Sequence, residues 1–157
     1  MRFSTLATAL TSATLASSRL IGIAAPSTLA PNSTFTLTLL SEGYIQTVAD
    51  VAVAWGFSIA PGYPGSLGSF TDSAYLGPEK SNQGQDNVTI IATVPEGLAS
   101  DSYKGQEILL SAGIYSLYGA SGSTTVTGFN VTVKVGEVTG GEIVQSEEQA
   151  WIQNTVQ

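Results

Sequence analysis

Two residue types that carry much enzyme chemistry, histidine and cysteine, are absent from this chain of 157 residues. A hydrolytic serine or cysteine triad needs a base to activate its nucleophile, and histidine is the usual base. Structural zinc sites use cysteine or histidine ligands. The sequence therefore predicts no catalytic residue, no cofactor, no metal and no disulfide.

Carboxylates are the remaining candidates for chemistry. Most of them lie beside Gly, Ser or Pro in expected loops: Asp72, Glu79, Asp86, Asp101 and Glu107. A carboxylate pair could serve a glycosidase, and Asp72 with Asp86 could hold calcium, although the D-x-D-x-D-G spacing is missing. Solvated loop charges are the simpler interpretation, so a glycan-active enzyme is the third of three functional hypotheses.

Tyrosine side chains offer a way to bind without catalysis. Exposed rings can stack on sugars, whereas buried rings anchor loops; the candidates are Tyr44, Tyr63, Tyr75, Tyr115 and Tyr118. A sugar platform needs coplanar exposed rings. A cell-wall or carbohydrate-associated binding module is therefore the second hypothesis.

The first 18 residues have the features of a secretory signal peptide. Arg2 precedes an uncharged run of 14 residues, Phe3 to Ala16, and Ala16 and Ser18 are small residues suited to the −3 and −1 positions. We expect cleavage between Ser18 and Arg19. The run is shorter than the roughly 20 residues that span a bilayer, so the sequence predicts a secreted, extracellular protein without membrane insertion.

The charge balance limits the choice of partner. The chain carries five basic and twelve acidic residues, for a net charge of −7. Nucleic acid and anionic membranes attract clustered Lys and Arg. Neither is an expected partner.

The rest of the chain alternates apolar and polar residues with a period of two, as half-buried β-strands do. The expected strands are residues 20–25, 35–39, 51–59, 88–94, 108–118 and 129–135. Gly113 could mark a β-bulge, and the segment from Leu98 to Tyr103 resembles a tyrosine corner. We predict an all-β domain over 19–135, an immunoglobulin-like antiparallel β-sandwich of about seven strands. The connection over 60–86 is either a binding loop or a segment with short extra strands.

The C-terminal residues 136–157 differ in character and are expected to form a linker and tail. Ser146-Glu147-Glu148-Gln149 matches a capping box, so a short helix over 146–154 would carry Trp151. A frayed tail is the alternative. The Trp151 side chain could dock on the domain or on a partner.

Three asparagines match the N-glycosylation acceptor pattern: Asn32, Asn87 and Asn130. Each shares the strand parity of neighbouring outward threonines, so all three are expected to face solvent. An unmodified Asn on a polar face would have the same parity.

Four segments in order resemble a known family. They are Glu42-Gly43-Tyr44-Ile45-Gln46, Tyr63-Pro64-Gly65-Ser66-Leu67-Gly68, Tyr75-Leu76-Gly77-Pro78 with Lys80-Ser81-Asn82, and Ser116-Leu117-Tyr118-Gly119-Ala120-Ser121. With these segments the chain, over about residues 20–135, resembles the necrosis-inducing secreted proteins of filamentous fungi, which act as effectors on plants.

The resemblance implies a function by protein–protein binding. The implied partner is a plant immune receptor-associated kinase, and the implied effect is suppression of pattern-triggered immunity. The resemblance also implies that some members induce cell death and that the host cytoplasm is a possible place of action. A fold without disulfides would keep its covalent structure in oxidising and reducing compartments. The recognition-loop candidates are Tyr63, Pro64, Gly65, Ser66, Leu67, Gly68, Tyr75, Leu76, Gly77, Pro78, Lys80 and Asn82. The oligomeric state is not predicted.

Overall fold

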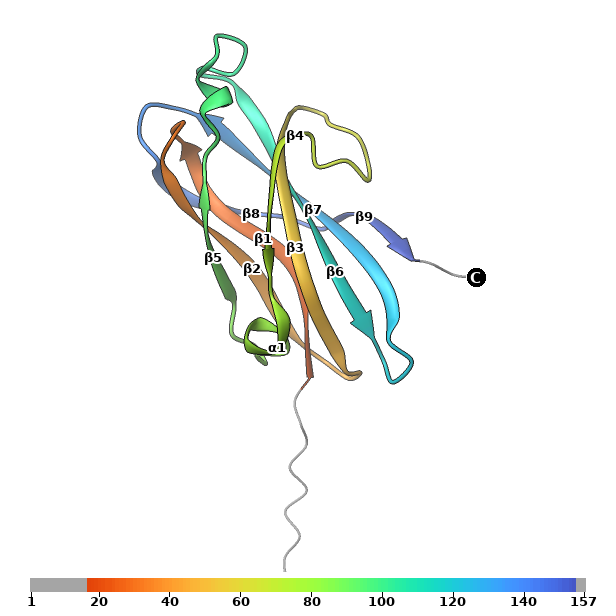
Figure 1. Cartoon of the computed structure of the whole chain (residues 1–157). Helices are drawn as coiled ribbons and strands as arrows, with labels where there is room; N and C mark the ends of the chain where they lie inside the picture. The colour runs from red at the N-terminus through yellow and green to blue at the C-terminus, as the bar shows by residue number, and fades with distance from the viewer. Residues whose placement is uncertain (1–16, 155–157) are drawn as a thin grey trace, which may run out of the picture.

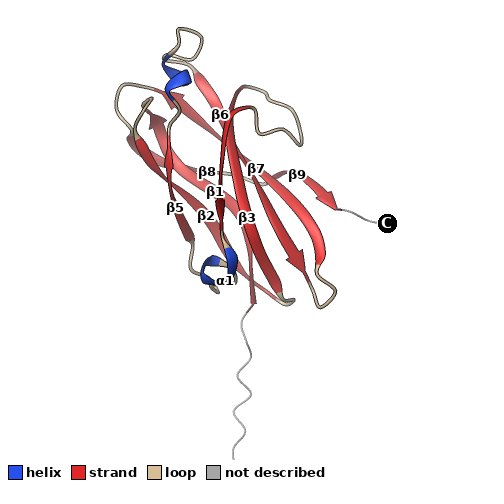
Figure 2. Cartoon of the chain, in the orientation of Figure 1, coloured by secondary structure: helices blue, strands red, loops and turns tan. Residues whose placement is uncertain are grey.

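A computed structural model describes residues 17–154 of the chain (Figure 1). The strands are β1 (Ser17–Leu29), β2 (Thr34–Tyr44), β3 (Val48–Ile59), β4 (Ser69–Tyr75), β5 (Val88–Thr93), β6 (Glu107–Tyr118), β7 (Ser123–Val135), β8 (Gly140–Gln145) and β9 (Gln149–Asn154). The helical turns are α1 (Gly77–Lys80) and η1 (Glu96–Ala99), and Figure 2 shows how small a part they form. The all-β prediction is confirmed, and each predicted strand is present.

All nine strands belong to one barrel-like sheet. Its order is β4-β3-β6-β7-β1-β2-β5, with β8 paired to β1 and β9 paired to β7. The two layers of the predicted sandwich are thus parts of a single sheet, because β1 changes partner along its length. Residues 17–24 pair antiparallel with β2, whereas Thr28 and Leu29 pair parallel with β7. Pro26 lies between these stretches and has no N–H to donate to a ladder.

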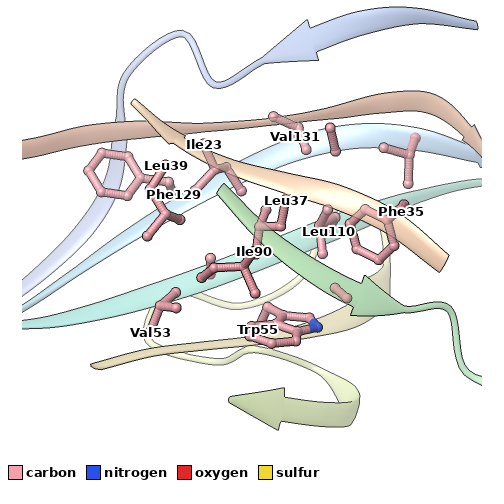
Figure 3. Packing of buried hydrophobic residues seen from close by; sticks show 14 of the residues in the cluster. Ile23, Phe35, Leu37, Leu39, Val53, Trp55, Ile90, Leu110, Phe129 and Val131 are labelled. Carbon is pink, nitrogen blue, oxygen red and sulfur yellow. The ribbon is translucent and has the colours of Figure 1, made fainter. Parts of the chain in front are cut away.

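The core lies between the β1-β2-β5 and β4-β3-β6-β7 parts of the sheet. Alternate residues of β2 and β3, among them Leu37, Val53 and Trp55, point into one cluster of buried side chains (Figure 3). The rings of Phe35 and Phe57 meet edge-on across it, with centroids 6.5 Å apart. Because each fully buried side chain of this size contributes about 1.5–3 kcal/mol, apolar burial can hold the domain together without a covalent cross-link.

The predicted bulge at Gly113 is wrong. β6 pairs with β3 and with β7 through Gly113 without a register shift, and the shift lies in β3 between Asp50 and Ala52. The extra residue there, Val51, reverses the side to which the alternating residues point. Asp50 therefore faces inward, although its sequence parity matches the outward residues of the strand.

The predicted tail helix is also wrong, because residues 140–145 and 149–154 form β8 and β9. Ser146 does not cap a helix: its Oγ accepts a hydrogen bond from the Ile23 N–H at 3.0 Å, and its own N–H donates to the Ile23 carbonyl. The indole of Trp151 lies against Gly128, where an added Cβ would overlap the ring. Contacts with β1 and β7 thus override the local capping pattern.

Further short elements fill the long connection between β3 and β5. β4 pairs along β3, and α1 follows it directly. Within residues 17–154, no helix is long and apolar enough to cross a membrane.

Candidate functional site

Three of the four motif segments meet at one end of the molecule. The β2–β3 turn, the α1 segment and the β6–β7 turn lie together at the lower end of Figure 1, where the chain enters β1. We call this the motif end and define it by the start of β1 with residues 42–50, 75–83 and 116–121. The fourth segment, Tyr63–Gly68, lies at the other end of β4. The predicted recognition loops therefore do not form one continuous surface.

Hydrogen bonds join the motif segments to one another. The Ser18 N–H donates to Asn82 Oδ1 at 2.7 Å, which ties β1 to the α1 segment. The Asp50 N–H donates to Ser81 Oγ at 2.7 Å, and the Ser116 hydroxyl donates to Asp50 Oδ1 at 2.6 Å. Residues from β1, β3, β6 and the α1 segment are thus held in a defined arrangement.

Two tyrosines and an arginine form a second group at the motif end. The rings of Tyr44 and Tyr118 meet edge-on with centroids 6.0 Å apart. The Arg19 guanidinium lies 4.6 Å from the centroid of the Tyr44 ring, and its Nη2 is 2.6 Å from Glu42 Oε1. All three side chains line a cavity of 390 Å³ between β1 and β7. Burial, reinforced by the nearby Asp50 carboxylate, raises the pKa of Tyr118 above its ordinary value.

Among the described residues, Asp50 is the one buried acidic residue, with 2 % of its surface exposed. Burial raises the pKa of the Asp50 carboxyl, and the hydrogen bond from Ser116 opposes that shift. Asp50 is not among the predicted site residues, because uninterrupted alternation along β3 places it outward. Only the register shift before Ala52 reveals its inward position.

Exposed apolar side chains also gather at the motif end. Ile45, at the tip of the β2–β3 turn, is 96 % exposed, and Tyr75 is 71 % exposed. Tyr75 was among the predicted recognition residues, but Ile45 was not. An isoleucine between Tyr44 and Gln46 in a strand-to-strand turn, where polar residues are usual, was the available signal.

The other candidate residues are distributed over the surface. Asn32 and Asn87 are exposed, whereas Asn130 is half-buried with its Oδ1 enclosed and without a hydrogen-bond partner. Ser18 and Arg19, which flank the predicted cleavage point, both lie within β1, while residues 1–16 of the predicted leader lie outside the described residues.

Of the carboxylates that were considered for chemistry, Glu79 and Asp86 line the same cavity. Asp72, Glu79, Asp86, Asp101 and Glu107 are all exposed. In the described part of the chain, no group of three Asp or Glu side chains could hold a metal ion. Tyr63 is 83 % exposed on its own loop.

Comparisons with known proteins bear on the whole domain. A family model described as the Nis1 family matches residues 16–134. A protein named necrosis-inducing secreted protein 1 from Colletotrichum orbiculare is 44 % identical over 149 residues, which cover 94 % of this chain and 88 % of that protein. A protein of the same name from Colletotrichum higginsianum is 44 % identical over 134 residues, covering 85 % of this chain and 89 % of that protein.

Proposed function

The chain belongs to the Nis1 family, and from that premise we propose that it is a secreted fungal effector that induces necrosis by binding host proteins through the motif end. The partner that the resemblance implies is a plant immune receptor-associated kinase. Binding would suppress pattern-triggered immunity.

One observation carries this proposal. Three segments that are distant in the sequence meet at the motif end, and the side chains of Ile45 and Tyr75 in these segments are exposed. Exposed apolar and aromatic groups around an ordered centre are typical of protein-binding surfaces. The hydrogen bonds of Asp50 and Asn82 keep this surface in one shape, which reduces the entropy cost of association.

We further propose that the protein acts by binding and not by catalysis. The sequence has no histidine or cysteine to serve as base or nucleophile. Without cysteine, the fold also has the same covalent structure in the extracellular space and in the reducing host cytoplasm. Either compartment is compatible with the proposed function.

Infiltration of the purified secreted protein into leaves tests the function, with the variant Ile45→Asp as the matched comparison. In parallel, the protein would be tested for capture by the cytoplasmic domains of plant immune receptor-associated kinases and of unrelated plant kinases. We expect cell death and selective capture by the immune kinases, both reduced in Ile45→Asp. Cell death without capture of any kinase would contradict the proposed partner, and absence of both would contradict the function.

Carbohydrate binding is a second candidate, because one feature of the outer sheet face favours it. Tyr115 and Trp151 line a cavity of 290 Å³ over the small residues Ala52, Ala54 and Gly113. Aromatic side chains can stack on a sugar ring. Retention on insoluble fungal or plant polysaccharide, lost in Tyr115→Ala, together with failure to bind any kinase, would reverse the order of the two candidates.

A further inference from the structure

A second cavity at the motif end borders Asp50. It has a volume of 530 Å³ and lies between residues 48–51 of β3 and the segment from Tyr75 to Gln83. Sites for small molecules usually have volumes of about 300–1,000 Å³. The cavity can therefore accept a long side chain from another protein.

Asp50, which lines the cavity, is a buried acid for which the described residues provide no cation. The Asp50 carboxyl accepts a hydrogen bond from the Ser116 hydroxyl at Oδ1, while the Asp50 N–H donates to Ser81 Oγ. Of the basic side chains at this end, Arg19 pairs with Glu42, and Lys80 lines a different cavity. Buried carboxylates are normally paired with a positive charge, because an unpaired one loses its hydration without compensation.

We propose that this cavity binds a basic side chain, arginine or lysine, of the partner protein, with the Asp50 carboxylate as its counter-ion. The inference rests on the proposed function and specifies the chemistry of its partner. It means that recognition combines a charged contact in the cavity with contacts by Tyr75, which lines the cavity, and by Ile45 in the β2–β3 turn.

The other lining groups suit an organic cation better than a metal ion. A single carboxylate is a poor cage for calcium, which takes six to eight oxygen ligands. Tyr75 lines the cavity, and aromatic rings attract guanidinium and ammonium groups. The side-chain amide oxygen of Gln83 can accept a hydrogen bond from an additional N–H group of arginine, while Gln83 Nε2 donates to the Ser81 carbonyl. The net charge of −7 also favours approach of a basic partner surface.

The test uses Nα-acetyl-arginine methylamide as the probe and Nα-acetyl-citrulline methylamide as its neutral counterpart of nearly the same shape. Each is titrated into the isotope-labelled protein, and amide chemical shifts are followed by nuclear magnetic resonance. We expect the arginine compound to shift the signals of residues 48–51 and 75–83 with a dissociation constant of about 1–10 mM. The citrulline compound should leave those signals in place.

Two variants remove the proposed site in different ways, and a third serves as control. Asp50→Asn should weaken arginine binding by about tenfold or more. Ala49→Phe keeps the carboxylate but fills the cavity from an exposed lining position, and it should have the same effect even if Asp50→Asn were to unfold. Glu79→Gln removes one exposed negative charge close to the cavity and should change binding by less than about twofold.

Several results would overturn the inference. Equal shifts with both compounds, shifts confined to other parts of the surface, or undiminished binding in the folded Asp50→Asn and Ala49→Phe variants would each do so. Loss of arginine binding with full necrosis in leaves would confirm the cavity and contradict its role in the proposed function. Absence of arginine binding to a protein that captures its kinase would contradict this inference alone.

Discussion

Asp50 links local backbone geometry to the stability of the whole domain. The register shift in β3 turns its side chain inward, where burial raises the pKa of the carboxyl. The folded protein thus holds the Asp50 proton more tightly than the unfolded chain does. The resulting stabilisation is fully present below about pH 3.9, the pKa of an aspartate in the unfolded chain. It is lost as the pH rises through the higher pKa of Asp50 in the folded protein.

Asp50→Asn should remove this dependence on pH. We expect its free energy of unfolding to fall less between about pH 4 and pH 7 than that of the unmodified protein. Urea unfolding at a series of pH values measures the difference. Glu79→Gln, at an exposed position, should leave the slope unchanged. Parallel pH profiles for Asp50→Asn and the unmodified protein would contradict the assigned cause.

The three glycosylation candidates should differ in occupancy. Asn32 and Asn87 are exposed, whereas Asn130 is half-buried on β7 between neighbouring strands. A glycan needs an accessible side-chain nitrogen, so we expect occupancy at Asn32 and Asn87 to exceed that at Asn130. Glycopeptide mass spectrometry of protein secreted from a fungal host measures each site. Highest occupancy at Asn130 would show that the acceptor is modified before this packing forms.

Among the elements, β9 depends on a specific fit between Trp151 and a glycine pair. Gly113 and Gly128 lie opposite each other in the β6–β7 ladder, and Trp151 lies against both. We expect Gly128→Ala to destabilise the protein by about 1–3 kcal/mol, because the added Cβ would overlap the indole. In a Trp151→Ala background the same change should cost much less. Urea unfolding of the four proteins measures this coupling, and an equal cost in both backgrounds would contradict the fit.

The start of β1 should contribute to stability although it borders the predicted cleavage point. Ser18 is buried and donates its N–H to Asn82, and Ser17 pairs with Tyr44. A chain that begins at Arg19 should therefore be less stable than one that begins at Ser17 by roughly 1–2 kcal/mol. Chemical denaturation of the two purified forms tests this. Equal stability would show that the first pair of residues adds nothing to the fold.

Alternation in the sequence predicts which segments are strands but not how they assemble. Four strands follow from period two, and 108–118 follows from a run that is apolar on both faces. β4 follows from neither pattern, because most of its side chains are exposed on both faces, as suits an edge strand. The division of β1 between β2 and β7 depends on tertiary pairing around Pro26. The capping box at Ser146 has the right residues for a helix, but its hydroxyl is used by Ile23.

The candidate site was predictable only in part, for related reasons. The motif segments could be selected from the sequence, and Tyr75 and Asn82 do belong to the motif end. The strand order brings three of the motif segments together at the motif end and places the Tyr63 loop elsewhere. Asp50 could not be placed inward without knowledge of the register shift, and its role as a counter-ion stays a proposal.

At the scale of the whole molecule, one end concentrates the features expected of a binding surface. The β2–β3 turn, the α1 segment and the β6–β7 turn converge there, with a buried acid beside a cavity and the exposed side chains of Ile45 and Tyr75. The opposite end has the exposed Tyr63 loop, and exposed Ile91 lies on the separate edge strand β5. We propose that the motif end, and not the Tyr63 loop or β5, contacts the host protein.

The most direct measurement compares two isoleucine substitutions of the same kind at different places. Ile45 is 96 % exposed at the motif end, and Ile91 is 73 % exposed on β5. The dissociation constant for the captured kinase domain is measured for the unmodified protein, Ile45→Asp and Ile91→Asp, each confirmed as folded by its thermal transition. We expect kinase binding to be weakened by about tenfold or more in Ile45→Asp and to change by less than about twofold in Ile91→Asp. Unchanged binding by Ile45→Asp, or loss of binding by Ile91→Asp instead, would contradict the proposal.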